Sequence, residues 1–285
     1  MKKVLIIGAK GTLGSELVDL FSADKNYEVA AYDIENIDIT SKDQVDMLFL
    51  KEMPDIVINA AAYNAVDKAE EDDKEYEKAK MTNGEAPKFL AGAAKKHNAV
   101  FVQYVSDYVF DGEKGEYAET DRTNPISRYG RSKDLGEKNV KRVGDKYYLI
   151  RTSKLFGKPG KSKEAKKSFF ETILMLAKEK DSLKVIDSER SCFTYVPDLA
   201  KATKRLVEEE YRYGIYHLIN EGAVTWYEGV KTLFEIAKIK TSVIPVSSEE
   251  FPRPAKRPRS SVLLNTKFPK LRNYKEAIKE WLRMA

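Results

Sequence analysis

A glycine-rich turn directly after a short apolar run is the feature that most limits how this chain can fold. The run Val4–Ile7 reads as a strand, and Gly8, Gly11 and Gly14 follow it with the spacing G-x-x-G-x-x-G at the start of a helical pattern. Glycines in such a strand-to-helix turn allow a tight bend and let the backbone approach a pyrophosphate at the helix N-terminus. The turn therefore predicts dinucleotide binding, with a purely structural turn as the alternative.

The first half of the chain alternates strand and helix patterns, which is typical of an α/β protein with a doubly wound parallel sheet of the Rossmann type. We expect residues 1–152, together with about 184–212, to form an NAD(P)-binding Rossmann domain. Residues 153–183 and 213–285 are expected to form a smaller C-terminal α/β lobe that binds the substrate. The predicted strands are Val4–Ile7, Glu28–Tyr32, Ile56–Asn59, Val100–Ser106 and Tyr147–Arg151, and the predicted helices lie near Ser15–Phe21, Lys42–Lys51, Glu75–His97 and Ser132–Lys141.

The second half has a looser pattern and two basic loops, Lys158 to Lys167 and Phe251–Arg259. The second loop combines proline with four positive charges, so neither a helix nor a strand is feasible there. Its guanidinium groups, Arg257 in particular, fit a clamp for a substrate diphosphate, with a solvated loop as the alternative. Trp226 and Tyr227 are expected in the core of the lobe rather than in a stacking platform. Further helices are predicted at Phe169–Lys178, Pro197–Glu209, Trp226–Ala237 and Tyr274–Met284, and further strands at Leu183–Ile186, Tyr216–Asn220 and Ser242–Val246.

Composition excludes several classes of function. The 50 lysines and arginines nearly balance the 45 aspartates and glutamates, which favours a solvated surface over a nucleic-acid partner. No apolar run reaches the length of about 18 residues that a membrane span needs, and the first apolar stretch is too short for a secretory signal, so a cytoplasmic location is expected. A single cysteine and two histidines predict neither a disulfide nor a metal site.

An acidic residue ends the second predicted strand. Asp33 is placed to accept hydrogen bonds from the ribose hydroxyls of adenosine and to repel a 2′-phosphate, which favours NADH over NADPH. Lys10 in the glycine turn could offset that repulsion, and an aspartate at a strand end is also a common turn residue. Asp38 and Ile39 lie where the chain could contact the adenine, although a helix-capping role explains Asp38 equally well.

Small side chains follow the third predicted strand. Ala60, Ala61 and Ala62 would let the backbone approach a cofactor at the carboxyl edge of the sheet. A helix start packed tightly against the sheet is the alternative interpretation.

A serine, a tyrosine and a lysine are spaced as a ketone reductase requires. Ser106 ends the fourth strand, and Tyr129 and Lys133 are one helical turn apart, on the same face of a helix. Hydride transfer to a ketone leaves an oxyanion that needs a proton, and a lysine cation lowers the pKa of a neighbouring tyrosine, whose ordinary value is about 10. Tyr76 and Lys80 have the same spacing, but they lack the upstream serine that ends a strand. We therefore predict that Ser106, Tyr129 and Lys133 are catalytic.

These residues resemble the dTDP-4-dehydrorhamnose reductase family, which belongs to the extended short-chain dehydrogenase/reductases. The resemblance covers nearly the whole chain. It rests on Pro54–Ala62, Ala65–Glu70, Ser106–Gly112 (S-D-Y-V-F-D-G), Tyr129–Lys133, Arg151–Ser153, Gly214–Leu218, Thr225–Tyr227, Arg253–Pro258 (R-P-A-K-R-P) and Ser261.

The resemblance implies reduction of the C4 ketone of a nucleotide-linked 4-keto-6-deoxysugar by NADH or NADPH, in dTDP-rhamnose biosynthesis, with Tyr129 as the proton donor. The expected partner is a nucleotide-diphosphate sugar, and a homodimer is compatible with the sequence. The family roles place Ser106, Asp107 and Tyr108 on the sugar. They place Gly11, Thr12 and Leu13 on the pyrophosphate, Asp33, Asp38 and Ile39 around adenosine, and Ala61, Ala62, Tyr63 and Tyr104 beside the cofactor.

Three departures from the family pattern lie on the substrate side. Lys154 stands where the family has a tryptophan that packs on the sugar, so an aromatic wall has become a cation. Asp187–Thr194 lacks the glutamine, glycine and proline of the pattern D-Q-x-G-x-P-T, and Lys166–Phe169 replaces G-N-N-F. The cofactor motifs are intact, so the departures leave open which sugar and which nucleotide base the chain binds.

Two other functions are compatible with the fold. A non-catalytic regulatory subunit that resembles the methionine adenosyltransferase beta subunit would bind the dinucleotide and act through a partner, but the presence of Ser106, Tyr129 and Lys133 favours catalysis. An epimerase or a dehydratase is less favoured, because a dehydratase would need an added acid–base pair where this chain has Asp107 and Tyr108.

Overall fold

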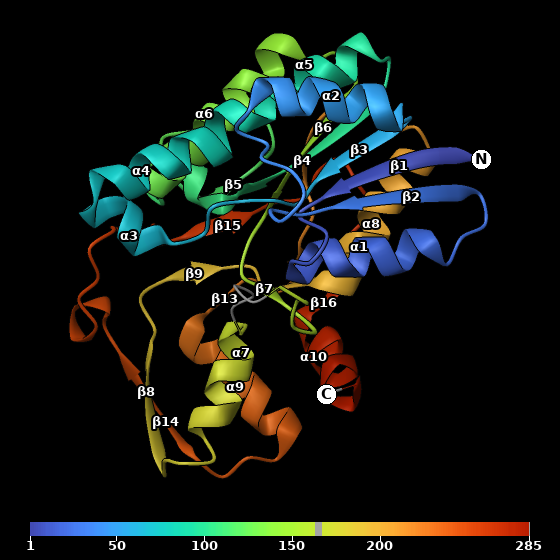
Figure 1. Cartoon of the computed structure of the whole chain (residues 1–285). Helices are drawn as coiled ribbons and strands as arrows, with labels where there is room; N and C mark the ends of the chain where they lie inside the picture. Colours follow the sequence, from blue (N-terminus) through green and yellow to red (C-terminus); the bar gives the residue numbers. More distant parts are fainter. Residues whose placement is uncertain (163–166, 285) are drawn as a thin grey trace.

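The computed structural model describes residues 1–162 and 167–284 and contains a larger domain built on a six-stranded parallel sheet and a smaller lobe (Figure 1). The strand order is β11-β6-β4-β3-β1-β2. Because the order reverses between β1 and β3, their carboxyl ends form the crevice in which such sheets bind ligands. The strands are β1 Lys2–Ile7, β2 Tyr27–Tyr32, β3 Ile56–Asn59, β4 Val100–Ser106, β6 Tyr147–Thr152 and β11 Gly214–His217.

Helices cover both faces of this sheet, as Figure 1 shows. The strands are apolar on both faces, and all residues of β3 are buried. One face packs against α1 Thr12–Ser22 and α8 Val196–Glu208 through a core that includes Leu17, Phe21 and Leu199. The other face packs against α2 Lys42–Glu52, α5 Ala86–Lys96 and α6 Arg128–Val143. The predicted fold class is therefore confirmed.

The single helix predicted at Glu75–His97 is wrong. The chain forms α4 Asp73–Ala79, a π-helical turn η1 Lys80–Glu85 and then α5. This wider turn carries Asn83, whose side chain accepts from the Tyr63 backbone N–H and donates to the Tyr63 carbonyl and to Ser132. A helix that the sequence did not predict, α3 Val66–Glu71, precedes α4.

The lobe is built around an aromatic core in which Phe156, Phe170, Phe193 and Trp281 are buried. Trp226 and Tyr227 are partly buried against this core, as predicted. The predicted strand Tyr216–Asn220 is instead two strands, and Phe251–Arg259 contains neither helix nor strand. The remaining elements are η2 Asp107–Val109, β5 Gly115–Tyr117, β7 Leu155–Phe156, α7 Phe169–Leu176, β8 Ser182–Ile186, β9 Arg190–Ser191, β10 Thr194–Tyr195, β12 Asn220–Glu221, β13 Val224–Thr225, α9 Trp226–Ala237, β14 Ser242–Val246, η3 Ser248–Glu250, β15 Ser261–Leu263, β16 Leu271–Asn273 and α10 Tyr274–Met284.

Two strands lie on the other side of the expected domain boundary. The strand β11, which we assigned to the lobe, is an edge strand of the main sheet, because Gly214–His217 pairs with β6. The strand β8, which we assigned mostly to the Rossmann domain, pairs in parallel with β14 of the lobe. We propose a two-part division with β11 in the Rossmann domain and β8 in the lobe.

Three further expectations concern membrane spans, metal and cysteine chemistry, and the first basic loop. None of their helices is long and apolar enough to cross a membrane. They contain no group of three or more histidine, cysteine or acidic side chains arranged to hold a metal ion, and Cys192 is a buried free thiol. The loop predicted at Lys158 to Lys167 includes residues 163–166, which lie outside the described residues.

A buried ion pair fixes α6 against the sheet. Arg151 on β6 donates to both carboxylate oxygens of Glu137 on α6, at 2.9 and 2.7 Å, and both side chains are 1% exposed. The same guanidinium lies 3.3 Å from Nε2 of His217, whose Nδ1 donates to the Leu264 carbonyl at 3.0 Å. His217 is therefore held as a neutral acceptor, and the network joins α6, β6, β11 and the C-terminal segment.

Protonation of His217 is expected to weaken the fold as the pH falls from about 6.5 to about 4. Burial and the Arg151 cation lower the pKa of His217 to about 4 from an ordinary value of 6.5. Between these values the unfolded chain binds a proton that the folded chain does not, so the free energy of unfolding decreases as the pH falls. We expect a contribution on the order of 2–3 kcal/mol, measured by urea unfolding at a series of pH values.

The matched control is His217→Gln, which keeps an oxygen to accept from Arg151 and cannot titrate. The informative quantity is the difference between the two proteins. The pKa of Asp107, which burial raises to about 6, adds a contribution of opposite sign in the same window. A difference that stays constant from pH 6.5 to pH 4 would contradict the prediction.

Candidate active site

The glycine turn has the geometry that a pyrophosphate site requires. Gly8 has φ +76°, and a Cβ there would lie 2.5 Å from the Ala61 backbone nitrogen. A Cβ on Gly14 would lie 1.9 Å from the Gly8 carbonyl oxygen. Gly11 caps α1, so the N-terminus of that helix lies at the turn. Gly160 packs closely on this turn, where a Cβ on it would lie 2.7 Å from the Thr12 nitrogen. The close contacts of Gly8 and Gly14 require glycine and form the kind of backbone turn that binds a pyrophosphate.

The predicted ribose contact and its neighbours form a charged cluster. Asp33 Oδ2 accepts from the Lys10 backbone N–H at 2.6 Å, and Oδ1 accepts from the Ile34 N–H at 2.8 Å. The Lys10 ammonium lies 2.9 Å from Oε1 of Glu35. Two carboxylates and one ammonium therefore meet at the end of β2, so the cluster carries a net negative charge.

Three other predicted cofactor residues make contacts within the protein. Asp38 Oδ1 accepts from the backbone N–H and the hydroxyl of Thr40 in a turn before α2, whose cap is Ser41 and not Asp38. Ile39 is buried in the core, and the Tyr104 hydroxyl bonds that of Thr203 on α8. These contacts are structural, and contact with a cofactor stays a prediction for Asp38, Ile39 and Tyr104.

The segment after β3 lies directly across from the glycine turn. The Ala60 N–H donates to the carbonyl of Ile7 on β1, and the Ala61 N–H donates to the Asn59 side chain. The Tyr63 hydroxyl donates to Glu75 on α4. The small residues of Ala60–Ala62 thus lie against Gly8, at the same sheet edge as the start of α1 with Thr12 and Leu13.

The three predicted catalytic residues meet at the carboxyl end of β4. Ser106 ends this strand, and Ser127 caps α6, which carries Tyr129 and Lys133 in its first turns. The Tyr129 hydroxyl interacts with the Ser106 side chain and lies 3.3 Å from Oδ1 of Asn64. The Lys133 ammonium lies 5.9 Å from the centre of the Tyr129 ring. The arrangement brings a proton donor, a hydroxyl and a cation together.

Burial dominates the electrostatics of this trio. The pKa of Lys133 falls to about 8 because the ammonium is desolvated. The pKa of Tyr129 is raised above its ordinary value, first by burial and then by the negative charge of Asp107. This direction is opposite to the lowering that we predicted, since in this structure Lys133 lies beside the ring of Tyr129 and burial outweighs its charge.

The predicted sugar contacts, Asp107 and Tyr108, follow Ser106 in η2. Asp107 is 3% exposed and accepts from Ser106 Oγ at 3.0 Å and from Ser261 Oγ at 2.6 Å. Burial raises the pKa of Asp107 to about 6. The Tyr108 ring packs edge-on against that of Tyr129, with centroids 6.0 Å apart. Both residues therefore lie beside the catalytic tyrosine.

The basic loop Phe251–Arg259 is tied down by acidic side chains. Arg257 donates to both carboxylate oxygens of Asp67 on α3, at 2.5 and 2.7 Å, and its side chain is 9% exposed. Arg253 pairs with Glu189, which also accepts from the Trp226 indole. The loop is therefore not a freely solvated one. Contact of Arg257 with a diphosphate stays a prediction, and it would require the guanidinium to leave or share Asp67.

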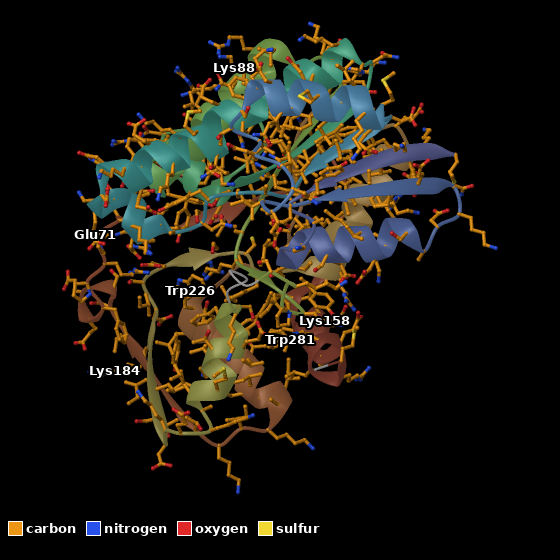
Figure 2. The ribbon with its side chains drawn as sticks, viewed as in Figure 1. Glu71, Lys88, Lys158, Lys184, Trp226 and Trp281 are labelled. Atoms are coloured by element: carbon orange, nitrogen blue, oxygen red, sulfur yellow. The ribbon has the colours of Figure 1, made fainter. Side chains whose placement is uncertain are left out.

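Lys154 occupies an unusual environment. Its backbone is left-handed, with φ +41°, and its ammonium lies 3.9 Å from the centre of the Trp226 ring and 5.0 Å from that of Phe193. Figure 2 labels Trp226 at the end of the lobe nearest the sheet domain. The Lys154 Nζ is buried and has no hydrogen-bond partner among the described residues. The structure thus places this cation against two aromatic rings of the lobe, and its contact with a substrate stays a prediction.

Sequence reasoning missed residues whose roles depend on contacts between distant segments. Asn64, which reaches the Tyr129 hydroxyl, lies just after the alanines that we singled out, so its place in the same loop was an available signal. Asp67 and Glu189 gave no local signal of their pairing with Arg257 and Arg253.

Comparisons with known proteins show the family to which the chain belongs. The family model described as the RmlD substrate binding domain matches residues 1–285. A dTDP-4-dehydrorhamnose reductase of Aggregatibacter actinomycetemcomitans is 38% identical over 279 residues, which cover 94% of this chain and 92% of that protein. Two solved structures of proteins with the same name are similar over nearly all of both chains. That from Clostridium acetobutylicum ATCC 824 has 39% identity and a TM-score of 0.91 and covers 99% of each chain. That from Bacillus anthracis str. Ames, in complex with NADP, has 33% identity and a TM-score of 0.93 and covers 100% of this chain and 99% of the other.

Proposed function

Since this chain belongs to the RmlD substrate binding domain family together with dTDP-4-dehydrorhamnose reductases, we propose that it reduces the C4 ketone of a nucleotide-linked 4-keto-6-deoxysugar, in dTDP-rhamnose biosynthesis. It is a nicotinamide-dependent oxidoreductase by family. The observation that supports the reaction is the meeting of Ser106, Tyr129 and Lys133 at the same carboxyl edge of the sheet as the glycine turn. The regulatory-subunit alternative is not favoured, because the similar proteins are named as reductases.

Each of the three catalytic side chains has its own role in the proposed reduction. A bound nicotinamide dinucleotide supplies the hydride that adds to the ketone carbon. Tyr129 gives its hydroxyl proton to the ketone oxygen, so that the C=O bond becomes a C–O–H group and a tyrosinate remains. Lys133 stabilises that tyrosinate by its charge. Ser106, which donates to Asp107 in this structure, turns its single hydroxyl proton to the ketone oxygen and holds the carbonyl in place.

The charged cluster at the end of β2 favours NADH. A 2′-phosphate on the adenosine ribose would face the Asp33 and Glu35 carboxylates, and Glu35 already engages the Lys10 ammonium that could otherwise neutralise it. The ribose hydroxyls of NADH can instead donate to Asp33, whose carboxylate is held in place by two backbone N–H groups. NADH is therefore the proposed cofactor.

A kinetic comparison of the two cofactors tests the proposed function. With a nucleotide-linked 4-keto-6-deoxysugar, the wild type is expected to oxidise NADH with a kcat/KM at least about tenfold above that for NADPH, which corresponds to about 1.4 kcal/mol. Replacing Asp33 by asparagine removes the charge that repels the 2′-phosphate, so the ratio should fall to within about threefold of one. The loss of reduced-nicotinamide absorbance gives both rates.

The matched control is Asp19→Asn, which removes an exposed carboxylate on α1 and should leave the ratio unchanged. A wild type that prefers NADPH would overturn the cofactor assignment and leave the reaction standing. Failure to oxidise either cofactor with any nucleotide 4-keto-6-deoxysugar would overturn the reaction itself.

Three further assignments stay proposals. Arg257 is proposed to contact the substrate diphosphate after release from Asp67, and Asp107 and Tyr108 to contact the sugar. The homodimer and the cytoplasmic location that we expect from the sequence stay predictions as well.

A further inference from the structure

The buried ammonium of Lys154 has no hydrogen-bond acceptor among the described residues, and a bound ligand could supply one. Burial lowers the pKa of Lys154 to about 8, while the nearby Asp107 charge acts in the opposite direction. Its Nζ has no hydrogen-bond partner among the described residues, although burying a charge without one is costly. The faces of Trp226 and Phe193 offset part of that cost through cation–π attraction, but they accept no conventional hydrogen bond.

Lys154 lies next to the reacting centre. Ser106 is the register partner of Thr152 in the sheet, and Lys154 follows Thr152 by two residues. The Thr152 Oγ1 and the Thr194 Oγ1 are also buried without a partner, and the Thr194 N–H donates to the Lys154 carbonyl. Three unpartnered polar groups therefore belong to segments that contact one another, and one of them, Thr152, pairs in register with Ser106.

Asp107 and Lys154 contribute one negative and one positive charge to this side of the site. The Asp107 charge acts on Lys154, yet the Lys154 Nζ has no hydrogen-bond partner among the described residues. Asp107 accepts from Ser261, and Ser106 no longer donates to it once its proton turns to the ketone, so the carboxylate has the capacity to accept from the sugar. A ligand group that reaches both side chains would accept from Lys154 and donate to Asp107.

We propose that Lys154 and Asp107 together bind the C3 hydroxyl of the ketosugar and make that hydroxyl a requirement for efficient reduction. This inference rests on the proposed function and names the substrate class, a 4-keto-6-deoxyhexose that retains the hydroxyl next to the ketone. A hydroxyl both accepts and donates, so it satisfies the two partners at once. A carboxylate would be repelled by Asp107, and a deoxy carbon would leave the Lys154 ammonium unpaired.

The position of Asp107 beside Ser106 indicates which hydroxyl of the sugar is bound. Ser106 Oγ, which is proposed to hold the C4 oxygen, lies 3.0 Å from Oδ1 of Asp107. The substituent that reaches Asp107 and Lys154 is therefore attached to a carbon adjacent to C4. Of the two adjacent ring carbons, C5 carries the methyl group of a 6-deoxysugar, which leaves the C3 hydroxyl.

The test compares a nucleotide-linked 4-keto-6-deoxyhexose with its 3-deoxy counterpart. A site that is built to bond a hydroxyl rejects the analogue that lacks it strongly, so we expect the wild-type kcat/KM to favour the hydroxylated sugar by at least about 100-fold. Lys154→Met, which has similar length but no donor, should reduce this preference to less than about tenfold. Lys154→Gln keeps a donor and should retain an intermediate preference.

The control is Lys184→Met, which removes an exposed lysine from the outer strand β8 of the same lobe (Figure 2) and should keep the wild-type ratio. Thermal melts identify any variant that fails to fold, and the ratio between two substrates within one protein does not depend on the active fraction. Equal reduction of both sugars by the wild type, or an unchanged ratio in Lys154→Met, would overturn the inference and leave the proposed function intact. Absence of reduction with either sugar would instead count against the proposed function.

Discussion

Replacing Tyr129 by phenylalanine is expected to lower kcat by about 10²–10⁴-fold, the range for loss of a positioned general acid. The change removes one oxygen atom, and the ring can keep its edge-on contact with Tyr108. Its lost hydrogen-bond partner, Asn64, lies at 3.3 Å, a long contact, so the fold should be little affected. Dinucleotide affinity, measured by calorimetry, should therefore stay close to that of the wild type while reduction of the ketosugar nearly stops.

The chain provides a matched control in Tyr76→Phe. Tyr76 and Lys80 have the same spacing, and the Lys80 ammonium lies 5.0 Å from the Tyr76 ring, at least as near as Lys133 is to Tyr129. Tyr76 lies on α4 and not beside Ser106, so this variant should keep the wild-type kcat. Full activity in Tyr129→Phe would reject the proton donor and restore the regulatory-subunit hypothesis.

The second large effect is expected at the ion pair beneath the catalytic helix. Glu137→Gln leaves the Arg151 cation buried without a full counter-charge, which typically costs about 3–5 kcal/mol of the free energy of unfolding. Replacing both partners by apolar residues, as in Glu137→Leu with Arg151→Met, should recover most of that loss, because neither charge is then buried. Urea unfolding of Glu137→Leu, of Arg151→Met and of the double variant closes the cycle.

A surface pair serves as the comparison. Glu250 pairs with Lys184, and both side chains are about half exposed, so Glu250→Gln should change the free energy of unfolding by less than about 1 kcal/mol. If Glu137→Gln cost no more than Glu250→Gln, the ion pair would not be what holds α6 in place.

Much of the sheet domain was predictable because local patterns and packing agree there. The runs at Val4–Ile7, Ile56–Asn59 and Val100–Ser106 are apolar on both faces, and each ends at a residue that reaches the carboxyl edge. Ser106, Tyr129 and Lys133 could be found for the same reason, because strand ends and helix turns meet at that edge.

The rest depends on contacts between segments far apart in the sequence. The π-helical turn at Lys80–Glu85 brings Asn83 to Tyr63 and Ser132, and no local pattern predicts such a turn. The pairing of Arg257 with Asp67 and the isolation of the Lys154 ammonium arise only once the lobe is packed. The sequence predicted a lowered pKa for Tyr129, whereas burial raises it. The spacing of a tyrosine and a lysine carries no information on burial.

Tyr129, Lys133 and Glu137 follow one another at intervals of one helical turn on α6, so a single helix carries the proton donor, its cation and the anchor to the sheet. The spacing of the reactive groups is thus fixed by backbone geometry, while Lys154 belongs to a separate segment that begins after β6. If Lys154 selects the sugar as proposed, mutations in that segment change the accepted sugar and leave the spacing of the groups on α6 unaltered. Substrate range and mechanism could then evolve on separate segments.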